Sequence, residues 1–308
     1  MEDGRGAGIG EASHQGVPGE ALAGPRVGGI MPNARITSVT GPVDLYSLIW
    51  CHEYGGDYRS WEQQVRYFSR RYRVVTWNYR GYPPSEVPKE GSAYSVEILV
   101  EDLRGLMQHL GIRRAHVGGL SLGGGVTVNF GIRHPDLAAS LIICGAGSGS
   151  DNPEEFVKNA AAQADLYERE GAEAKARNFA ANPARRGFAD KDPRGHAEFM
   201  RNVLDHSGVG SALMARGVQM KRKTIYQLES ELKKITAPSL IVVGDQDEPC
   251  LGPGLFMKKH IPHAGLVVTP MTGHTVNIEE PGLFNQLVAE FLTSVESGRY
   301  GTWKGVAR

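Results

Sequence analysis

The sequence predicts an α/β fold with a mostly parallel central sheet, helices on both faces of that sheet, and a helical insertion. Short continuous apolar runs alternate with amphipathic helical patterns over residues 35–146, and the alternation returns over 229–308. Continuous apolar strands of this kind are typical of a parallel sheet covered on both faces. Between these two stretches, residues 147–228 are charged and helical in pattern, without a strand-like run. We therefore expect one core built from both stretches, with 147–228 inserted into it.

The elements of the first stretch follow from their patterns. The apolar runs LYSLIWC, RVVTWN, AHVGG and ASLIIC predict buried strands at 45–51, 73–78, 115–119 and 139–144. Ser60, with Gln63 three residues later, forms a capping box and predicts a helix over 60–72. Leucine and methionine side chains recur on one stripe over 95–111, which predicts a second helix. A third helix is expected after the glycines that follow Ser121.

The second stretch repeats the alternation. The runs PSLIVVG and GLVVTP predict strands at 238–244 and 265–270, with a helix near 253–260 between them. Apolar residues over 281–295 recur at helical spacing from Phe284 to Val295 and predict the last helix.

Composition excludes several classes of protein. The chain has 308 residues with 34 basic and 34 acidic side chains, so no charge excess indicates a nucleic-acid partner. No apolar run approaches the roughly 18 residues of a membrane helix, so we expect no membrane partner. Residues 1–34 lack the pattern of a signal peptide and are expected to form a flexible tail. Three cysteines in apolar settings indicate free thiols in a reducing compartment, and we expect a soluble cytoplasmic protein.

One serine lies in an unusual setting. Residues 119–123 read GLSLG, a G-x-S-x-G match between a predicted strand and a predicted helix. The glycines two positions from Ser121 allow the chain to turn sharply and expose the hydroxyl above the sheet. The backbone N–H of Leu122 then faces any carbonyl that the serine attacks. The alternative is a glycine-rich packing turn with an incidental serine.

A base and an acid follow downstream. His274 comes just past the strand predicted at 265–270, and a histidine suits a base because its pKa lies near neutrality. Asp245, Asp247 and Glu248 follow the strand predicted at 238–244. Asp245 should complete the exit turn of that strand, whereas Asp247 lies farther out, where the loop can return toward the histidine. Parallel sheets place their sites at these carboxyl ends.

The order Ser121, Asp247, His274 resembles the α/β-hydrolase family, over about residues 36–296. HEYGGDYRSW resembles that family's His-Gly-x loop, NYRGYPPS its Asp-x-Arg-Gly turn, and GHTVNIEEP its segment with the catalytic histidine. The resemblance implies that Asp247 is the acid, in a G-x-x-D pattern. It also implies that residues 147–228 form a lid and that the backbone N–H groups of Tyr54 and Leu122 form an oxyanion hole.

The chain departs from the family pattern at three positions. Asn78 replaces the usual aspartate and Pro83 the usual glycine, both in a loop expected to be structural. Glu53 replaces a glycine beside the expected oxyanion hole, where an inward carboxylate would oppose the developing negative charge. We therefore expect Glu53 to point away, toward Arg80 or His52. His52 is expected to hold this loop by hydrogen bonds.

These features predict a cofactor-free serine hydrolase that cleaves a small-molecule ester or lactone through an acyl-enzyme on Ser121. No CxxC or HExxH spacing indicates a metal site, and no Gly-Lys-Ser/Thr follows the glycines as in a phosphate loop. A serine at the turn disfavours dehalogenases and epoxide hydrolases, which use aspartate there in the resembling family. Two alternatives stay open: a carbon–carbon bond hydrolase of the same fold, and a ligand-binding member without turnover. The oligomeric state, a homodimer included, also stays open.

Overall fold

The computed structural model describes residues 35–41 and 46–301. The tail expected over residues 1–34 lies outside the described residues and stays a prediction.

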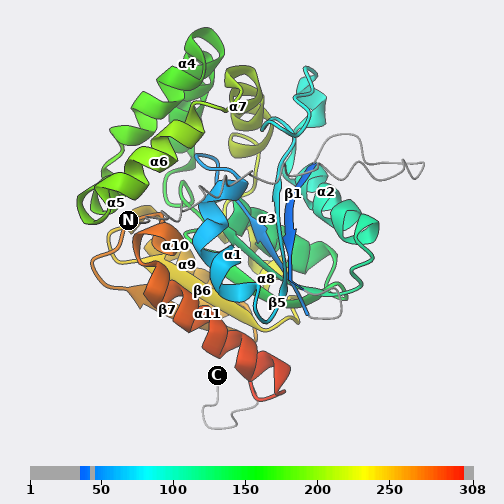
Figure 1. The fold of residues 1–308 in the computed structure, drawn as a ribbon. Coiled ribbons are helices and arrows are strands. Elements are labelled where there is room, and N and C mark those ends of the chain that lie inside the picture. Colours follow the sequence, from blue (N-terminus) through cyan, green and yellow to red (C-terminus); the bar gives the residue numbers. More distant parts are fainter. Residues whose placement is uncertain (1–34, 42–45, 302–308) are drawn as a thin grey trace, which may run out of the picture. The chain divides into compact units, whose positions relative to one another are not determined.

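A seven-stranded sheet forms the centre of the fold (Figure 1). The strand order is β1-β3-β2-β4-β5-β6-β7, with β1 antiparallel to β3 and every other pair parallel. The predicted mostly parallel sheet is thus confirmed. The strands are β1 Arg35–Thr40, β2 Ser47–Cys51, β3 Arg73–Asn78, β4 Ala115–Leu120, β5 Ala138–Cys144, β6 Ser239–Gly244 and β7 Ala264–Thr269. The apolar runs of the sequence predict all of these strands except β1.

Helices cover both faces of the sheet, as predicted. On one face, the Trp50 ring of β2 stacks on Trp61 and packs beside Phe68 of α1 and Phe284 of α11. On the other face, Ile49 and Val117 belong to a buried cluster with the apolar side chains of α2, α3 and α9. These helices are α1 Glu62–Phe68, α2 Val96–His109, α3 Leu122–Arg133, α9 Glu248–His260 and α11 Pro281–Glu296, and α10 Val276–Glu279 precedes the last of them.

The chain between β5 and β6 is helical, with no strand in residues 147–228, all of which the structure describes. Three of its helices, labelled α4, α6 and α7, lie close together at one end of the sheet (Figure 1). The helices are α4 Pro153–Ala180, α5 Arg186–Lys191, α6 Pro193–Val203, α7 Gly208–Met214 and, just past residue 228, α8 Glu229–Leu232. A 3₁₀ turn, Pro183–Arg185, joins α4 to α5. We call residues 147–228 the insertion.

The predicted cap of the helix at 60–72 is wrong. A 3₁₀ turn, Tyr58–Trp61, comes first, and Asp57 caps it by accepting the Arg59 N–H at 2.8 Å. The Ser60 hydroxyl completes that box by accepting the N–H of Asp57 at 3.3 Å. α1 then begins at Glu62 without a side-chain cap. A carboxylate three residues earlier therefore takes the role that the sequence analysis gave to Ser60.

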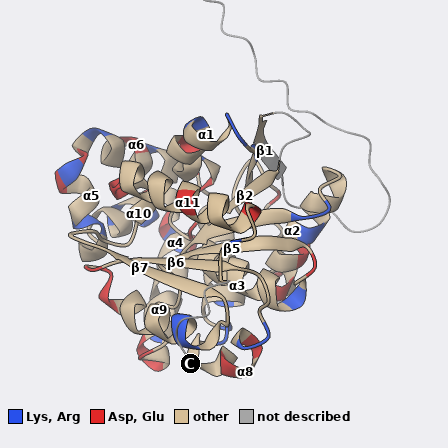
Figure 2. Cartoon of the chain, turned by 90° about the horizontal axis from the view of Figure 1, so that it is seen from below, with Lys and Arg blue, Asp and Glu red and all other residues tan. Residues whose placement is uncertain are grey.

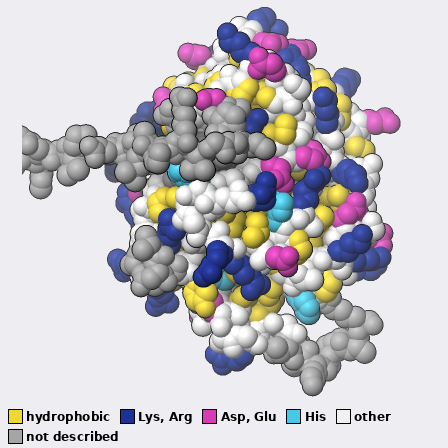
Figure 3. Space-filling view, turned by 90° about the vertical axis from the view of Figure 1, so that its right-hand side faces the viewer, with side chains coloured by type: hydrophobic (Ala, Val, Ile, Leu, Met, Phe, Trp, Pro, Cys, Tyr) yellow, Lys and Arg dark blue, Asp and Glu magenta, His cyan; other side chains and the backbone are white. Residues whose placement is uncertain are grey.

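Charged side chains of both signs share the surface, and the three cysteines are buried. Basic and acidic side chains are interspersed along the chain and on the face that Figure 3 shows (Figures 2 and 3). In the part of the chain that the structure describes, no helix is both long and apolar enough to cross a membrane. All three cysteines, Cys51, Cys144 and Cys250, are buried and unbridged. Burial raises the pKa of the Cys51 thiol to about 12, which keeps it protonated.

Candidate active site

The carboxyl ends of the central strands meet at one edge of the sheet. Cys51 pairs with Gly119, and Leu120 pairs with Cys144, so β2, β4 and β5 end side by side. Farther along, Gly244 of β6 pairs with Thr269 of β7. The loops that follow these strands therefore emerge at the same edge. They carry the predicted oxyanion loop, Ser121, the candidate acids and His274.

Ser121 occupies a strained turn. Its backbone has φ 56° and ψ −112°, a positive φ that non-glycine residues rarely adopt. A Cβ atom on Gly119 would lie 2.3 Å from the backbone of Gly123, and one on Gly123 would lie 2.0 Å from the Cys51 carbonyl oxygen. Both glycines are therefore required by close backbone approach. The turn ends β4 and begins α3, as the sequence analysis predicted.

His274 pairs with Asp247 and not with Asp245. The His274 Nδ1 and Asp247 Oδ2 atoms are 2.8 Å apart, and Asp247 is buried. Asp245 instead accepts the Thr272 N–H at 3.0 Å, which holds the exit turn of β6 to the loop after β7. Burial alone would lower the pKa of His274, but the Asp247 carboxylate, with a smaller contribution from Glu53, outweighs it and raises that pKa. The two aspartates thus have different partners at the same edge.

The serine turn and the His274–Asp247 pair lie against the same stretch of backbone. The Ser121 N–H donates to the Cys144 carbonyl at 2.8 Å. At the next residue, a Cβ atom on Gly145 would lie 3.2 Å from Asp247 Oδ2 and 3.4 Å from His274 Cε1. The backbone of Ser121 and the side chains of Asp247 and His274, far apart in the sequence, therefore all lie at the end of β5.

The loop after β2 packs against the serine turn. The close approach of Gly123 to Cys51 brings the first residues of this loop next to the start of α3. His52 Nε2 accepts the Tyr79 N–H at 3.3 Å, so its Nδ1 carries the proton and donates to the Glu53 carbonyl at 2.7 Å. Burial lowers the pKa of His52 to about 4, which keeps the ring neutral. His52 therefore holds the loop by hydrogen bonds.

Glu53 points to a partner that the sequence analysis did not name. Its carboxylate pairs with the guanidinium of Arg185 in the insertion, with one contact at 3.2 Å, and both side chains are buried. Arg80 binds Asp102 instead, and His52 contacts only the backbone oxygen of Glu53. The expected pairing of the Glu53 carboxylate with Arg80 or His52 is therefore wrong. The Arg185 guanidinium compensates the negative charge of Glu53, which would otherwise oppose an oxyanion nearby.

The insertion contributes directly to the site. The Ala184 carbonyl accepts the His274 N–H at 3.0 Å, and the Arg185 guanidinium lies between the Phe179 and Phe199 rings. The sequence predicts only that Arg185 belongs to a charged stretch with a helical pattern. No local pattern distinguishes Arg185 from the exposed arginine that follows it, because its burial depends on Glu53, 132 positions away in the sequence.

Asp247, Cys250 and His274 place ligand-type atoms within 4.8 Å of one another. The Cys250 S–H donates to the Gly145 carbonyl at 3.2 Å, and burial raises the pKa of this thiol well above its usual range. A metal would have to displace that thiol proton and the His274–Asp247 hydrogen bond. These contacts favour a packing role for Cys250.

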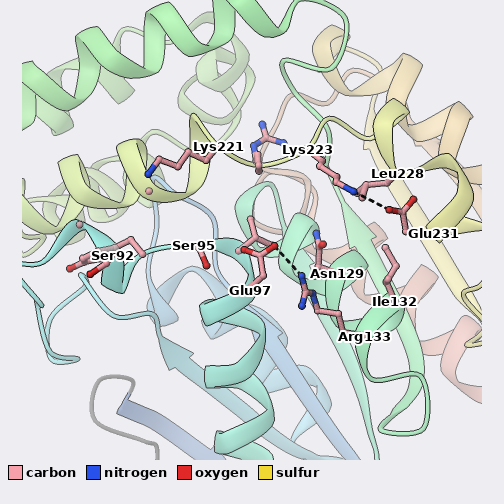
Figure 4. A pocket seen from close by; sticks show the side chains of 15 residues that line it. Ser92, Ser95, Glu97, Asn129, Ile132, Arg133, Lys221, Lys223, Leu228 and Glu231 are labelled. Atoms are coloured by element: carbon pink, nitrogen blue, oxygen red, sulfur yellow. Dashed lines mark hydrogen bonds and ion pairs between the residues drawn. The ribbon is translucent and has the colours of Figure 1, made fainter.

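A separate groove of about 550 Å³ lies between α2, α3 and the end of the insertion (Figure 4). Two ion pairs flank it: Arg133 with Glu97 at 3.0 Å, and Lys223 with Glu231 at 3.1 Å. Lys221 and Arg222 also line the groove, so its four basic side chains exceed its two acidic ones and its lining carries a net positive charge. Neither Ser121 nor His274 lines it, so this groove is not the site described above.

Fold and site together define the class of protein. Residues 46–281 match the family described as the alpha/beta hydrolase fold, and the chain belongs to that family. The resemblance found in the sequence is thereby confirmed.

Among its relatives, 3-oxoadipate enol-lactonase 2 of Acinetobacter baylyi is 26% identical, covering 80% of this chain and 89% of the relative. The enol-lactonase structure from Burkholderia xenovorans LB400 is 25% identical with a TM-score of 0.74, covering 84% of this chain and 96% of that one. The structure of a thermophilic esterase from Thermogutta terrifontis is 26% identical with a TM-score of 0.75, covering 85% of this chain and 93% of that one. The chain is accordingly a hydrolase of this fold.

Proposed function

We propose that this protein is a serine hydrolase that cleaves a small-molecule ester or lactone through an acyl-enzyme on Ser121. The observation that carries the proposal is the 2.8 Å contact between His274 and Asp247 beside a serine turn with φ 56°. A serine is a weak nucleophile unless a base takes its proton and a third group orients that base. The relatives named as an enol-lactonase and an esterase favour an ester or lactone as the substrate.

The chemistry needs only groups that the chain supplies. Because Nδ1 of His274 is engaged by Asp247, Nε2 is the nitrogen free to take the proton from the Ser121 hydroxyl. The serine oxygen then bonds to the substrate carbonyl carbon, and the carbonyl oxygen becomes an oxyanion. His274 returns the proton to the departing alcohol oxygen, which leaves the acyl group on Ser121. In a lactone this oxygen stays attached to the acyl group.

The second half-reaction repeats these steps with water. His274 takes a proton from a water molecule, whose oxygen attacks the acyl carbon. The Ser121 oxygen leaves with that proton and the carboxylic acid is released. In both halves the backbone N–H groups of Tyr54 and Leu122 stabilise the oxyanion, a contribution of about 2.7–4 kcal/mol per donor in a comparable site. The position of Tyr54 on the loop that packs against the serine turn supports this role.

We also propose that the insertion acts as the lid of the substrate pocket. Its contacts support this: Ala184 binds the His274 backbone, and Arg185 binds Glu53 next to Tyr54. A segment that binds both the His274 backbone and the loop of Tyr54 would border any substrate bound between His274 and that loop.

The test is covalent labelling with a fluorophosphonate, together with turnover on a panel of p-nitrophenyl esters and lactones. We expect the label on the peptide that contains Ser121, and we expect Ser121→Ala to lose both the label and nearly all turnover. Ser92→Ala, an exposed serine on a distant turn, is the matched control and should behave as wild type. Retention of half the activity by Ser121→Ala would overturn the proposal.

A further inference from the structure

A fully buried lysine lies where the insertion meets the oxyanion loop, and the proposed reaction does not use it. Lys175, in α4, has 0% of its surface exposed. Its Nζ atom lies 3.0 Å from His206 Nδ1 and donates to the Ser211 hydroxyl at 2.9 Å. No carboxylate within the described ranges forms an ion pair with it. A lysine in such a place is costly, because burial disfavours its charged form.

The ammonium group lies against two aromatic rings. Nζ is 4.7 Å from the centroid of Tyr54 and 4.7 Å from the centroid of Tyr82. A cation over an aromatic face is attracted by the negative face of the ring, most strongly where water is excluded. Burial lowers the pKa of Lys175 to about 7, against the opposing effect of the Glu53 and Asp57 carboxylates. The lysine therefore joins α4 to both tyrosines at once.

The hydroxyls of the two tyrosines connect the loop after β2 to the insertion. The Tyr82 hydroxyl donates to the Tyr54 carbonyl at 2.8 Å, and the Tyr54 hydroxyl donates to the Ser211 carbonyl at 2.8 Å. Ser211 lies in α7 and is also the residue whose hydroxyl accepts from Lys175. Tyr82 thus holds the main chain of Tyr54, and Ser211 holds its side chain. Lys175 contacts both tyrosine rings and the Ser211 hydroxyl.

A second branch fixes the far side of the loop. His206 is neutral because burial lowers its pKa to about 4, so its Nδ1 accepts from Lys175. Its Nε2–H then donates to Asp57 at 3.3 Å, and Asp57 caps the 3₁₀ turn that ends the loop. Lys175 therefore reaches both Tyr54 and Asp57, which bracket the loop between them.

We propose that Lys175 is a positioning residue that sets the Tyr54 N–H for oxyanion binding by fastening α4 and α7 to the Tyr54 and Tyr82 side chains. The proposal rests on the proposed function, in which the Tyr54 N–H is an oxyanion donor. It follows that the oxyanion hole is fully assembled only while the insertion is docked on the loop. An apolar side chain of similar size would fill the same volume. It would make no cation–π contact with the two tyrosine rings and no hydrogen bond to His206 or Ser211.

The experiment compares Lys175→Met with Lys158→Met, an exposed lysine in the part of α4 that precedes the break at Gly171. Active sites are counted by fluorophosphonate titration, and kcat, KM and the affinity for a boronic acid that mimics the tetrahedral state are measured per titrated site. In Lys175→Met we expect kcat and boronate affinity to fall about tenfold, with KM within about twofold of wild type. Lys158→Met should match wild type. This split is the signature of a lost transition-state interaction.

Tyr82→Phe is a second, independent variant, because it removes the hydrogen bond to the Tyr54 carbonyl and keeps the lysine. In this variant too, kcat and boronate affinity should fall while KM stays nearly constant. This variant tests the proposal if Lys175→Met does not fold. A purely structural role would lower the titrated fraction and leave kcat and boronate affinity per site unchanged, which overturns the proposal. Failure of wild type to label at Ser121 would instead overturn the proposed function on which this inference depends.

Discussion

The Ala184 carbonyl, in the insertion, accepts a hydrogen bond from the His274 N–H at 3.0 Å. The adjacent residue, Arg185, carries its guanidinium to the carboxylate of Glu53. Consecutive residues of the insertion therefore contact the loop that carries His274 and the loop that carries Glu53, which are the loops of the proposed base and the proposed oxyanion hole. Lys191 adds another link, because its Nζ atom lies 3.1 Å from Glu279, which in turn accepts the Gly273 N–H. The insertion helps to hold the site together.

The Glu53–Arg185 pair should be strongly coupled. Removing one partner leaves the other charge buried and uncompensated, which typically costs about 3–5 kcal/mol. We expect Glu53→Gln and Arg185→Met each to lower the free energy of unfolding by an amount of this order. The double variant should lose much less than the sum of the two, because it leaves no buried charge. Urea unfolding of the four proteins measures this directly.

The matched control for that cycle is an exposed pair, Arg66 with Glu62, one helical turn apart in α1. Exposed pairs of this kind contribute about 0.3–0.5 kcal/mol, so Arg66→Met should barely change the free energy of unfolding. Additive losses in the Glu53 and Arg185 variants would contradict the buried coupling.

Substitution of the two aspartates after β6 should have different effects on kcat. Asp247→Asn removes the partner that orients His274, and the equivalent change in serine proteases lowers kcat about 10⁴-fold. We expect a loss of several orders of magnitude with an unchanged far-UV circular dichroism spectrum. Asp245→Asn should keep kcat and lower the thermal midpoint, because Asp245 holds the Thr272 backbone. The reverse pattern would move the acid to Asp245.

The pH dependence of kcat/KM should reflect the His274–Asp247 pair. His274 must be neutral to accept a proton, and the Asp247 carboxylate raises its pKa despite the opposing effect of burial. The value of kcat/KM should therefore fall as pH decreases through a pKa above 6.5, the ordinary value for histidine. In Asp247→Asn, burial acts without the carboxylate, so the acidic limb should move to lower pH. An unmoved limb in the residual activity of that variant would assign the titration to another group.

Much of the fold, the serine turn and the pairing of His274 with Asp247 could be predicted from the sequence because their signals are local. Continuous apolar runs identify buried strands, and the GLSLG segment specifies its own turn through glycines that no other residue can replace. Asp247 and His274 follow predicted strands directly, and the carboxyl ends of parallel strands must lie at one edge. β1 was missed because it is the antiparallel edge strand and carries no continuous apolar run.

The residues that hold the site together could not be predicted in this way. Arg185 and Lys175 belong to a charged helical stretch in which nearly every turn carries an exposed charge. Their burial depends on Glu53, Tyr54 and Tyr82, which lie more than 90 positions away in the sequence. Side-chain pairing at such separation depends on how the insertion docks, and no pattern of spacing along the chain encodes that docking.

The serine turn offers the most direct test of how backbone packing sets reactivity. A Cβ atom at Gly123 would lie 2.0 Å from the Cys51 carbonyl oxygen, far inside contact distance, so Gly123→Ala must displace the start of α3. Because a misplacement of about 1 Å can cost 10²-fold in rate, we expect kcat per folded molecule to fall by at least about that factor. Circular dichroism should show that the sheet persists.

Two positions along the same helix, Gly125 is the matched control. A Cβ atom there would meet nothing within 4 Å, and Gly125 lies in α3, where alanine is favoured over glycine by about 1 kcal/mol. Gly125→Ala should therefore keep wild-type kcat and raise the thermal midpoint. Two glycine-to-alanine changes, 2 residues apart in one helix, would then have opposite consequences, because only Gly123 packs against the end of β2. Equal kcat values in the two variants would show that this packing does not position Ser121.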